Sequence, residues 1–184
     1  MNNILNSDLL IMNNEENLQT IDYSQKILEI KRVAKATKGS RAVTYRALAI
    51  VGNEIDKVGI GIGCADESSF AIKKAFFNAK QNLIVVPITK SESIPCVIKI
   101  TNASCAVWLS PSRKGSGVIA NGPIKTLMTY AGIKNVTVKQ FGSNNILKNV
   151  RITIFALKLL KEKIKLVKTQ SNIASRFYNK LMRI

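Results

Sequence analysis

The stretch that decides the fold is Val58-Gly59-Ile60-Gly61-Ile62-Gly63, in which branched apolar residues alternate with glycines. A period of two is typical of a β-strand, so the strand predicted over 57–64 has one apolar face and one face without side chains. Glycines on a strand face mark the close approach of another backbone or of a ligand. An apolar stripe at helical spacing follows over 71–83, and Asp66 and Glu67 stand at its start, where acids favour the helix dipole. We therefore expect a strand whose bare face meets other backbone, followed by a helix.

The residues before this strand complete a first structural unit. Segment 43–51 is rich in β-branched and apolar residues and predicts a second strand, joined to the first by a hairpin loop over 52–56. Further upstream, apolar spacing predicts a short helix over 21–33. A basic stretch over 31–41 overlaps its end and contains a turn at Gly39-Ser40. The unit is expected to read β-β-α, allowing for a third strand and a preceding helix.

A second unit follows a boundary near 90–95. Its expected elements are strands over 96–101 and 103–109, a basic Gly/Ser-rich loop over 110–117, a helix from Pro123 to Gly132 and a strand over 135–141. A long amphipathic helix then begins at Ile146 and runs into a basic tail. Such a helix can lie on an anionic membrane, but its apolar stripe is also what a two-layer core would bury, and we interpret it as core.

The charge of the chain indicates a polyanionic partner. It has 28 Lys and Arg against 11 Asp and Glu, a formal net charge of +17, and 46% hydrophobic residues, enough for a core. Residues 1–25 hold four acids and no Lys or Arg, whereas residues 93–184 hold 16 basic residues and the single acid Glu162. We expect an α+β fold with a disordered acidic leader (1–25), a basic N-terminal domain (26–92), a C-terminal α/β domain (93–160) and a basic helical tail (161–184). Nucleic acid or an anionic membrane surface is the expected partner.

Several classes of function have no support in the sequence. The absence of histidine removes the commonest general base and the commonest metal ligand. The three cysteines lack Cys-x-x-Cys spacing, which argues against a zinc site or a disulfide scaffold, and Cys64 near Lys57 is interpreted as a small half-buried hydrophobe, not a thiolate. The third glycine of a dinucleotide motif would fall on Cys64, and no phosphate-loop motif occurs. No enzyme activity, cofactor or metal is therefore expected.

Two basic segments are candidate phosphate-binding sites. In the first, Arg32, Lys35, Lys38 and Arg41 recur every three residues around a glycine turn, so several cations could grip phosphates while Gly39 lets backbone amides approach. A solvated basic hairpin is the alternative. In the loop over 112–117, Ser and Gly amides could form an anion-holding nest, with a plain connecting loop as the alternative.

Taken in order, these motifs resemble one family, the bacterial-type small-subunit ribosomal protein S5. The resemblance covers about 27–160. The motifs that carry it are Arg32-Val33-Ala34-Lys35 with Lys38-Gly39 and Arg41, the glycine strand at 58–63, Ala71-Ile72-Lys73-Lys74-Ala75, Gly115-Ser116-Gly117-Val118-Ile119-Ala120, and Phe141-Gly142-Ser143 through Asn149-Val150-Arg151. The family implies an N-terminal domain like a double-stranded-RNA-binding domain and a C-terminal domain of two-layer βαβ type. Ser40, Cys64 and Lys125 depart from the family pattern, and they bear on individual contacts and not on the fold.

The resemblance also implies a function and partners. It implies a structural constituent of the small ribosomal subunit that binds rRNA near the mRNA entry path, beside proteins S4 and S8, and supports subunit assembly and translational accuracy. Together with the basic segments, it makes the expected rRNA-binding residues Lys31, Arg32, Lys35, Lys38, Gly39, Ser40, Arg41, Arg46, Lys57, Arg113 and Lys114. The expected protein-interface residues are Gly115, Ser116, Gly117 and Lys125, in the region that faces S4.

The leader and the residue bias suggest where the protein works. The leader is Asn-rich and acidic, which fits neither a secretory signal nor a transit peptide, and Lys outnumbers Arg 21 to 7. We expect a plastid (chloroplast) ribosome, with a mitochondrial or bacterial ribosome as the alternative. A double-stranded-RNA-binding regulator outside the ribosome is the alternative function, and a phosphoryl-group enzyme that uses Lys and Ser is a third.

Overall fold

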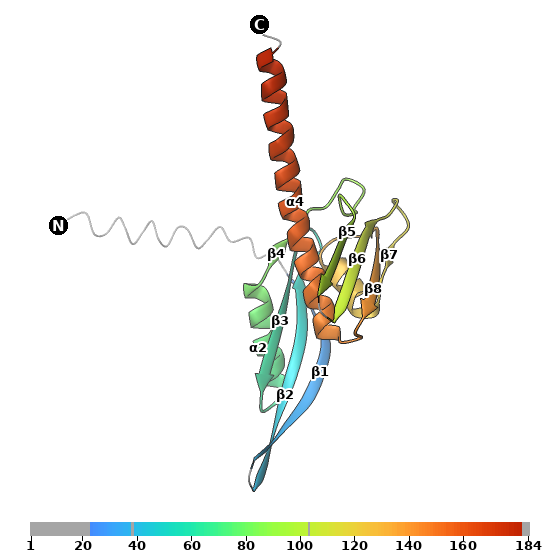
Figure 1. Ribbon diagram of the computed structural model, residues 1–184. Helices are drawn as coiled ribbons and strands as arrows, with labels where there is room; N and C mark the ends of the chain where they lie inside the picture. The colour runs from blue at the N-terminus through green and yellow to red at the C-terminus, as the bar shows by residue number, and fades with distance from the viewer. Residues whose placement is uncertain (1–22, 38, 103, 182–184) are drawn as a thin grey trace, which may run out of the picture.

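Two four-stranded sheets and three helices make up the computed structural model, which describes residues 23–37, 39–102 and 104–181 (Figure 1). The first sheet has the order β1-β2-β3-β4 and the second the order β5-β6-β8-β7. In the first half of the chain the elements are β1 (Ser24–Thr37), β2 (Ser40–Gly52), β3 (Lys57–Ala65), α2 (Ser68–Gln81) and β4 (Ile84–Val85). In the second half they are β5 (Ile98–Asn102), β6 (Cys105–Pro111), β7 (Val118–Ile119), α3 (Gly122–Tyr130), β8 (Val136–Gly142) and α4 (Ile146–Leu181).

The glycine strand is β3, and its bare face lies directly against α2. A Cβ atom built on Gly61 would collide with the backbone of Ala75 and Ala79, and glycines 59 and 63 meet the same helix in the same way. On the helix side the contact is made by fully buried alanines. Small residues on both surfaces let the two backbones approach closely. The expectation that this strand face meets other backbone is confirmed.

The helix predicted over 21–33 is wrong for residues 24–33, which belong to β1, whereas residues 21 and 22 lie outside the described part of the chain. Thirteen residues of β1 pair with β2 in antiparallel register, from Ser24 opposite Gly52 to Thr37 opposite Ser40. A register shift between Ile27 and Glu29 breaks the alternation of side chains there, so the apolar residues fall at a spacing that resembles a helix. Backbone hydrogen bonds to a distant strand override the local pattern.

The second sheet is built around a parallel crossover. β7 and β8 pair in parallel and are joined by α3, which gives the βαβ unit, while β5, β6 and β8 pair in antiparallel order. α3 begins as predicted, with Asn121 as its N-cap and Pro123 in its first turn. The short strands β4 and β7 were not anticipated as separate elements. The α+β fold class with two small domains is confirmed.

The first half of helix α4 packs into the hydrophobic core. Val150, Leu157 and Leu160 are fully buried there, so the interpretation of its stripe as core is confirmed (Figure 1). The same apolar cluster includes Ile50 and Val58 from the first sheet, so the two sheets share a continuous core. Beyond the sheets α4 continues alone, away from both (Figure 1). The domain limits at residues 92 and 160 stay predictions. Within the described residues, no helix is long and apolar enough to span a membrane.

Candidate nucleic-acid interface

The basic stretch forms the end of a hairpin that projects from the first sheet. β3 stops pairing with β2 at Tyr45, so residues 33–37 and 40–44 form a ribbon of only two strands. At about 3.4 Å per residue, this ribbon extends about 17 Å past the third strand (Figure 1). A two-stranded ribbon is marginally stable alone in water, so a partner that contacts both strands would stabilise it.

The strand register places cations on both faces of the hairpin. Side chains alternate along a strand, and directly opposed residues share a face. Lys31, Lys35 and Arg46 therefore lie on one face, because Lys31 is paired with Arg46. Arg32 and Arg41 lie on the other face. All five side chains are exposed, so the hairpin presents positive charge in two directions.

The hairpin has little negative charge of its own. Between residues 24 and 46 there are seven basic residues and one acid, Glu29. The carboxylate of Glu29 lies 3.0 Å from the ammonium of Lys31, which is opposite Arg46. Like charges placed directly opposite each other destabilise a sheet. Within the described residues this is one of two ion pairs, so the other cations of the hairpin are left to solvent or to a partner.

The turn itself is partly outside the described residues. Lys38 lies outside them, and for Ser40 the structure describes the backbone, which begins β2. Gly39 has φ of 86°, a left-handed conformation that glycine adopts without steric cost, and a Cβ there would meet nothing within 4 Å. The space beside the Cα atom of Gly39 is therefore free of other described atoms, and the approach of its backbone amide to a phosphate stays a prediction.

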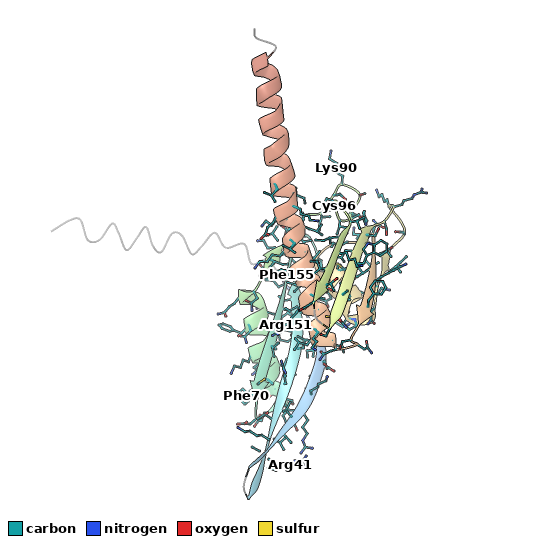
Figure 2. The ribbon with its side chains drawn as sticks, in the orientation of Figure 1. Arg41, Phe70, Lys90, Cys96, Arg151 and Phe155 are labelled. Carbon is teal, nitrogen blue, oxygen red and sulfur yellow. The ribbon has the colours of Figure 1, made fainter. Side chains whose placement is uncertain are left out.

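Other predicted contacts lie at the far end of the molecule. Lys57 is half-buried at the start of β3, about 45 Å along the sheet from the hairpin tip. The exposed residues Arg113 and Lys114 stand in the loop after β6, near residues 91–93. Figure 2 shows Arg41 and Lys90 at opposite ends of the folded body. The predicted rRNA-binding residues therefore form two separate groups.

The loop over 112–117 is held by a buried asparagine that sequence reasoning did not single out. Asn135 is 3% exposed, and its Oδ1 accepts hydrogen bonds from the N–H groups of Gly115 (2.9 Å) and Gly117 (3.3 Å). The N–H of Ser116 donates to the carbonyl of Arg113. These three amides are already bonded within the protein, so the expected anion-holding nest is not formed. The only sequence signal for Asn135 was a polar residue at the start of a predicted strand.

The predicted protein-interface residues do lie on one side of the second unit. Gly115 and Gly117 have positive φ values of 91° and 73° and face open space. The carbonyl of Gly117 accepts from the N–H of Val136, which joins the loop to β8. Lys125 is exposed on α3, beside a groove that Val118 and Glu54 also line. Ser116 is likewise exposed.

The interpretation of Cys64 needs a correction. Cys64 is exposed on the sheet face opposite α2, not half-buried, because it lies beyond the part of β3 that the second unit covers. Lys57 is at the opposite end of the same strand, about 23 Å away, so the two side chains do not meet.

Comparison with known proteins accounts for both halves of this arrangement. Residues 23–87 match the model of "Ribosomal protein S5, N-terminal domain", and residues 102–170 match that of "Ribosomal protein S5, C-terminal domain". The chain belongs to the ribosomal protein S5 family. The first match contains the whole hairpin and α2, and the second contains the 112–117 loop, α3 and most of α4.

Individual relatives of the S5 family cover most of the chain. A protein of Trieres chinensis named "Small ribosomal subunit protein uS5c" is 41% identical over 164 residues, 89% of each chain. A protein of the same name from Thalassiosira pseudonana is 44% identical over 79% of this chain and 81% of its own length. "Small ribosomal subunit protein uS5" of Trichormus variabilis is 39% identical over 80% of this chain and 85% of its own.

Proposed function

We propose that this protein is a structural constituent of the small ribosomal subunit, without catalytic activity, and that it binds small-subunit rRNA. The observation that carries the proposal is that both S5 family models match, in order, a chain whose hairpin projects exposed cations on two faces. Relatives with the chloroplast-type name uS5c support a plastid ribosome as its location. Its role is to hold rRNA and so to support subunit assembly.

The hairpin suits rRNA because it needs no base readout. The bases of an A-form helix are hidden in a deep, narrow groove, so proteins recognise such RNA by shape, phosphates and 2′-hydroxyls. A narrow ribbon with Arg32 and Arg41 on one face and Lys35 on the other contacts phosphates on two sides as it enters rRNA. Arg113 and Lys114 provide a second contact at the other end of the molecule.

The second unit offers a surface for the proposed partners among ribosomal proteins. The exposed loop at Gly115–Gly117 and the nearby Lys125 make a surface with little side-chain bulk in the loop, whose amides are hydrogen-bonded to Asn135. Our proposal is that S4 contacts this surface and that S8 is a further neighbour, near the mRNA entry path. Contact with S4 at this point supports translational accuracy.

Charge removal tests the rRNA role of the hairpin. In the variant R32Q/K35Q/R41Q, affinity for small-subunit rRNA should fall and the slope of log affinity against log salt should become shallower by about 0.7–0.9 for each phosphate that the variant no longer binds. The matched control is K90Q/K99Q/K139Q, which removes three exposed cations that lie outside the hairpin. An equal decrease of the salt slope in both variants would mean that the cations of the hairpin contribute no more to rRNA binding than other surface cations do.

Sedimentation of the native protein tests the ribosomal role itself. The protein should travel with small subunits through a sucrose gradient and stay there at physiological salt. A protein that remains at the top of the gradient but still binds duplex RNA would support the regulator outside the ribosome instead.

A further inference from the structure

The face of α2 that points away from the sheet carries a stripe of side chains. This stripe takes no part in the rRNA contacts proposed for the hairpin. Its members are two phenylalanines and three lysines, defined here as the α2 stripe: Phe70, Lys73, Lys74, Phe77 and Lys80. At 100° per residue, they lie opposite the alanines that pack on the glycine strand. The helix packs closely with one side and leaves this opposite side uncovered.

The aromatic rings of the stripe are unusually exposed. Phe70 is 59% and Phe77 62% exposed, the highest values for phenylalanine within the described residues. They are seven residues apart, about 10 Å along the helix axis. The ammonium of Lys73 lies 5.7 Å from the centre of the Phe70 ring. The Phe70 ring therefore stands next to a cation, and Phe77 lies about one helical turn from the lysines of the stripe. Both rings are exposed in the described structure.

The charge of α2 favours RNA over a protein partner. The helix contains no acidic residue between Ser68 and Gln81, and its lysines form no ion pair within the described part of the chain. The acids Asp66 and Glu67 stand before its first turn, at one end of the stripe. Lysine is depleted from protein–protein interfaces. Proteins that bind single-stranded nucleic acid, by contrast, combine aromatic rings, on which bases stack, with cations that bind the phosphates.

The position of the stripe joins it to the hairpin. Figure 2 shows Phe70 at the end of α2 nearer to the hairpin that carries Arg41. α2 packs on β2, which is the strand that continues into the hairpin, and on β3. A strand of RNA that leaves the hairpin therefore reaches the stripe without crossing the second unit.

We propose that the α2 stripe binds unpaired RNA, with bases stacked on Phe70 and Phe77 and phosphates held by the three lysines. The inference rests on the proposed function in taking RNA as the partner, and it adds a second mode of binding. The hairpin recognises RNA through its backbone, and the stripe recognises bases that are outside a helix, whatever their identity, because every base has a π-face.

The test separates stacking from charge and from simple apolar contact. The probes are an unstructured RNA of about 12 nucleotides, the same strand made abasic, and an RNA duplex of that length. Leucine keeps apolar area but has no π-face, so F70L/F77L should weaken binding of the base-containing strand by at least about fivefold. It should leave the abasic strand and the duplex within about twofold, and F70W/F77W should retain affinity. K73Q/K74Q/K80Q should weaken all three probes and reduce the salt slope on single strands.

Controls keep the outcome clear. Phe141 is an exposed phenylalanine in the second unit, 53% exposed, and F141L should change none of the three affinities. Full affinity of F70L/F77L for the base-containing strand would overturn the inference, and so would an equal decrease on the abasic strand. A stripe that instead binds an acidic protein would leave all RNA affinities of F70L/F77L unchanged, which also overturns the inference.

The same measurements separate this inference from the proposed function. If the hairpin variant alone loses rRNA binding, the proposed function stands while this inference fails. If the native protein does not sediment with small subunits but F70L/F77L no longer binds the single-stranded RNA, this inference stands while the proposed function fails.

Discussion

Gly61→Ala is the most direct test of the packing that organises the first unit. The added Cβ would collide with the backbone of Ala75 and Ala79, which cannot rotate aside as a side chain can. To make room, α2 must move outward by about 1 Å, which opens gaps around the fully buried alanines of the helix.

The expected cost follows from the nature of the clash. Overpacking a tight interior costs typically about 1–3 kcal/mol, and a clash with two backbone segments puts Gly61→Ala near the upper value. For a chain of this length, about 3 kcal/mol corresponds to a melting temperature lower by about 6–12 °C. Urea unfolding followed by circular dichroism measures the free energy of unfolding directly.

A glycine in open space supplies the control. A Cβ on Gly122, at the start of α3, would meet nothing within 4 Å, and its φ is not positive. Gly122→Ala should therefore leave the free energy of unfolding within about 0.5 kcal/mol or raise it slightly, because alanine restricts the unfolded chain. A decrease smaller than about 0.5 kcal/mol in Gly61→Ala would refute the claim that backbone contact on the bare strand face holds α2.

Two further substitutions test the polar contacts. Asn135→Ala removes two acceptor contacts to the 112–117 loop and a donor to the carbonyl of Ser91, so the free energy of unfolding should fall by about 2 kcal/mol in a urea titration, whereas Asn144→Ala, at an exposed position, should change it little. Glu29→Gln removes the acid beside Lys31 and frees that cation for phosphate, so rRNA affinity in a filter-binding assay should rise, by up to about fivefold. Glu54→Gln, at the other end of the molecule, should not change it, and a lower affinity in Glu29→Gln would show that the ion pair supports the binding conformation.

Short-range sequence patterns correctly predicted those helices and strands that are determined by residues close together in the chain. The alternation at 58–63 is complete within six residues, and the start of α3 is marked by Pro123 in its first turn, so both were predictable. The helix predicted over 21–33 failed because β1 is stabilised by bonds to residues up to 28 positions away, from Ser24 to Gly52. Apolar spacing over one short window cannot report a partner at that distance.

The candidate site divides in the same way. The basic residues around Gly39 were found from composition and spacing alone, and the structure shows that the side chains of Arg32, Lys35 and Arg41 are exposed. Of the two alternatives for the 112–117 loop, the anion-holding nest is not formed, because the amides of Gly115 and Gly117 bond to Asn135, 20 and 18 residues further along the chain. A sequence shows which groups can bind a phosphate, but it does not show which of them are already satisfied within the protein.

The sequence by itself determined the family, the positive charge of the body and the strand–helix pair at 57–83, because each depends on residue type and short-range period. The tertiary structure alone decided that the cations of the hairpin point to two faces, that Lys57 and the 112–117 loop lie at the opposite end, and that Phe70 and Phe77 remain uncovered. The physical reasons are strand register and packing. A one-residue change in strand pairing moves every side chain of the strand to the other face of the sheet, so register decides where the cations of the hairpin point. The close packing of the β3 and α2 backbones decides which side of the helix remains exposed.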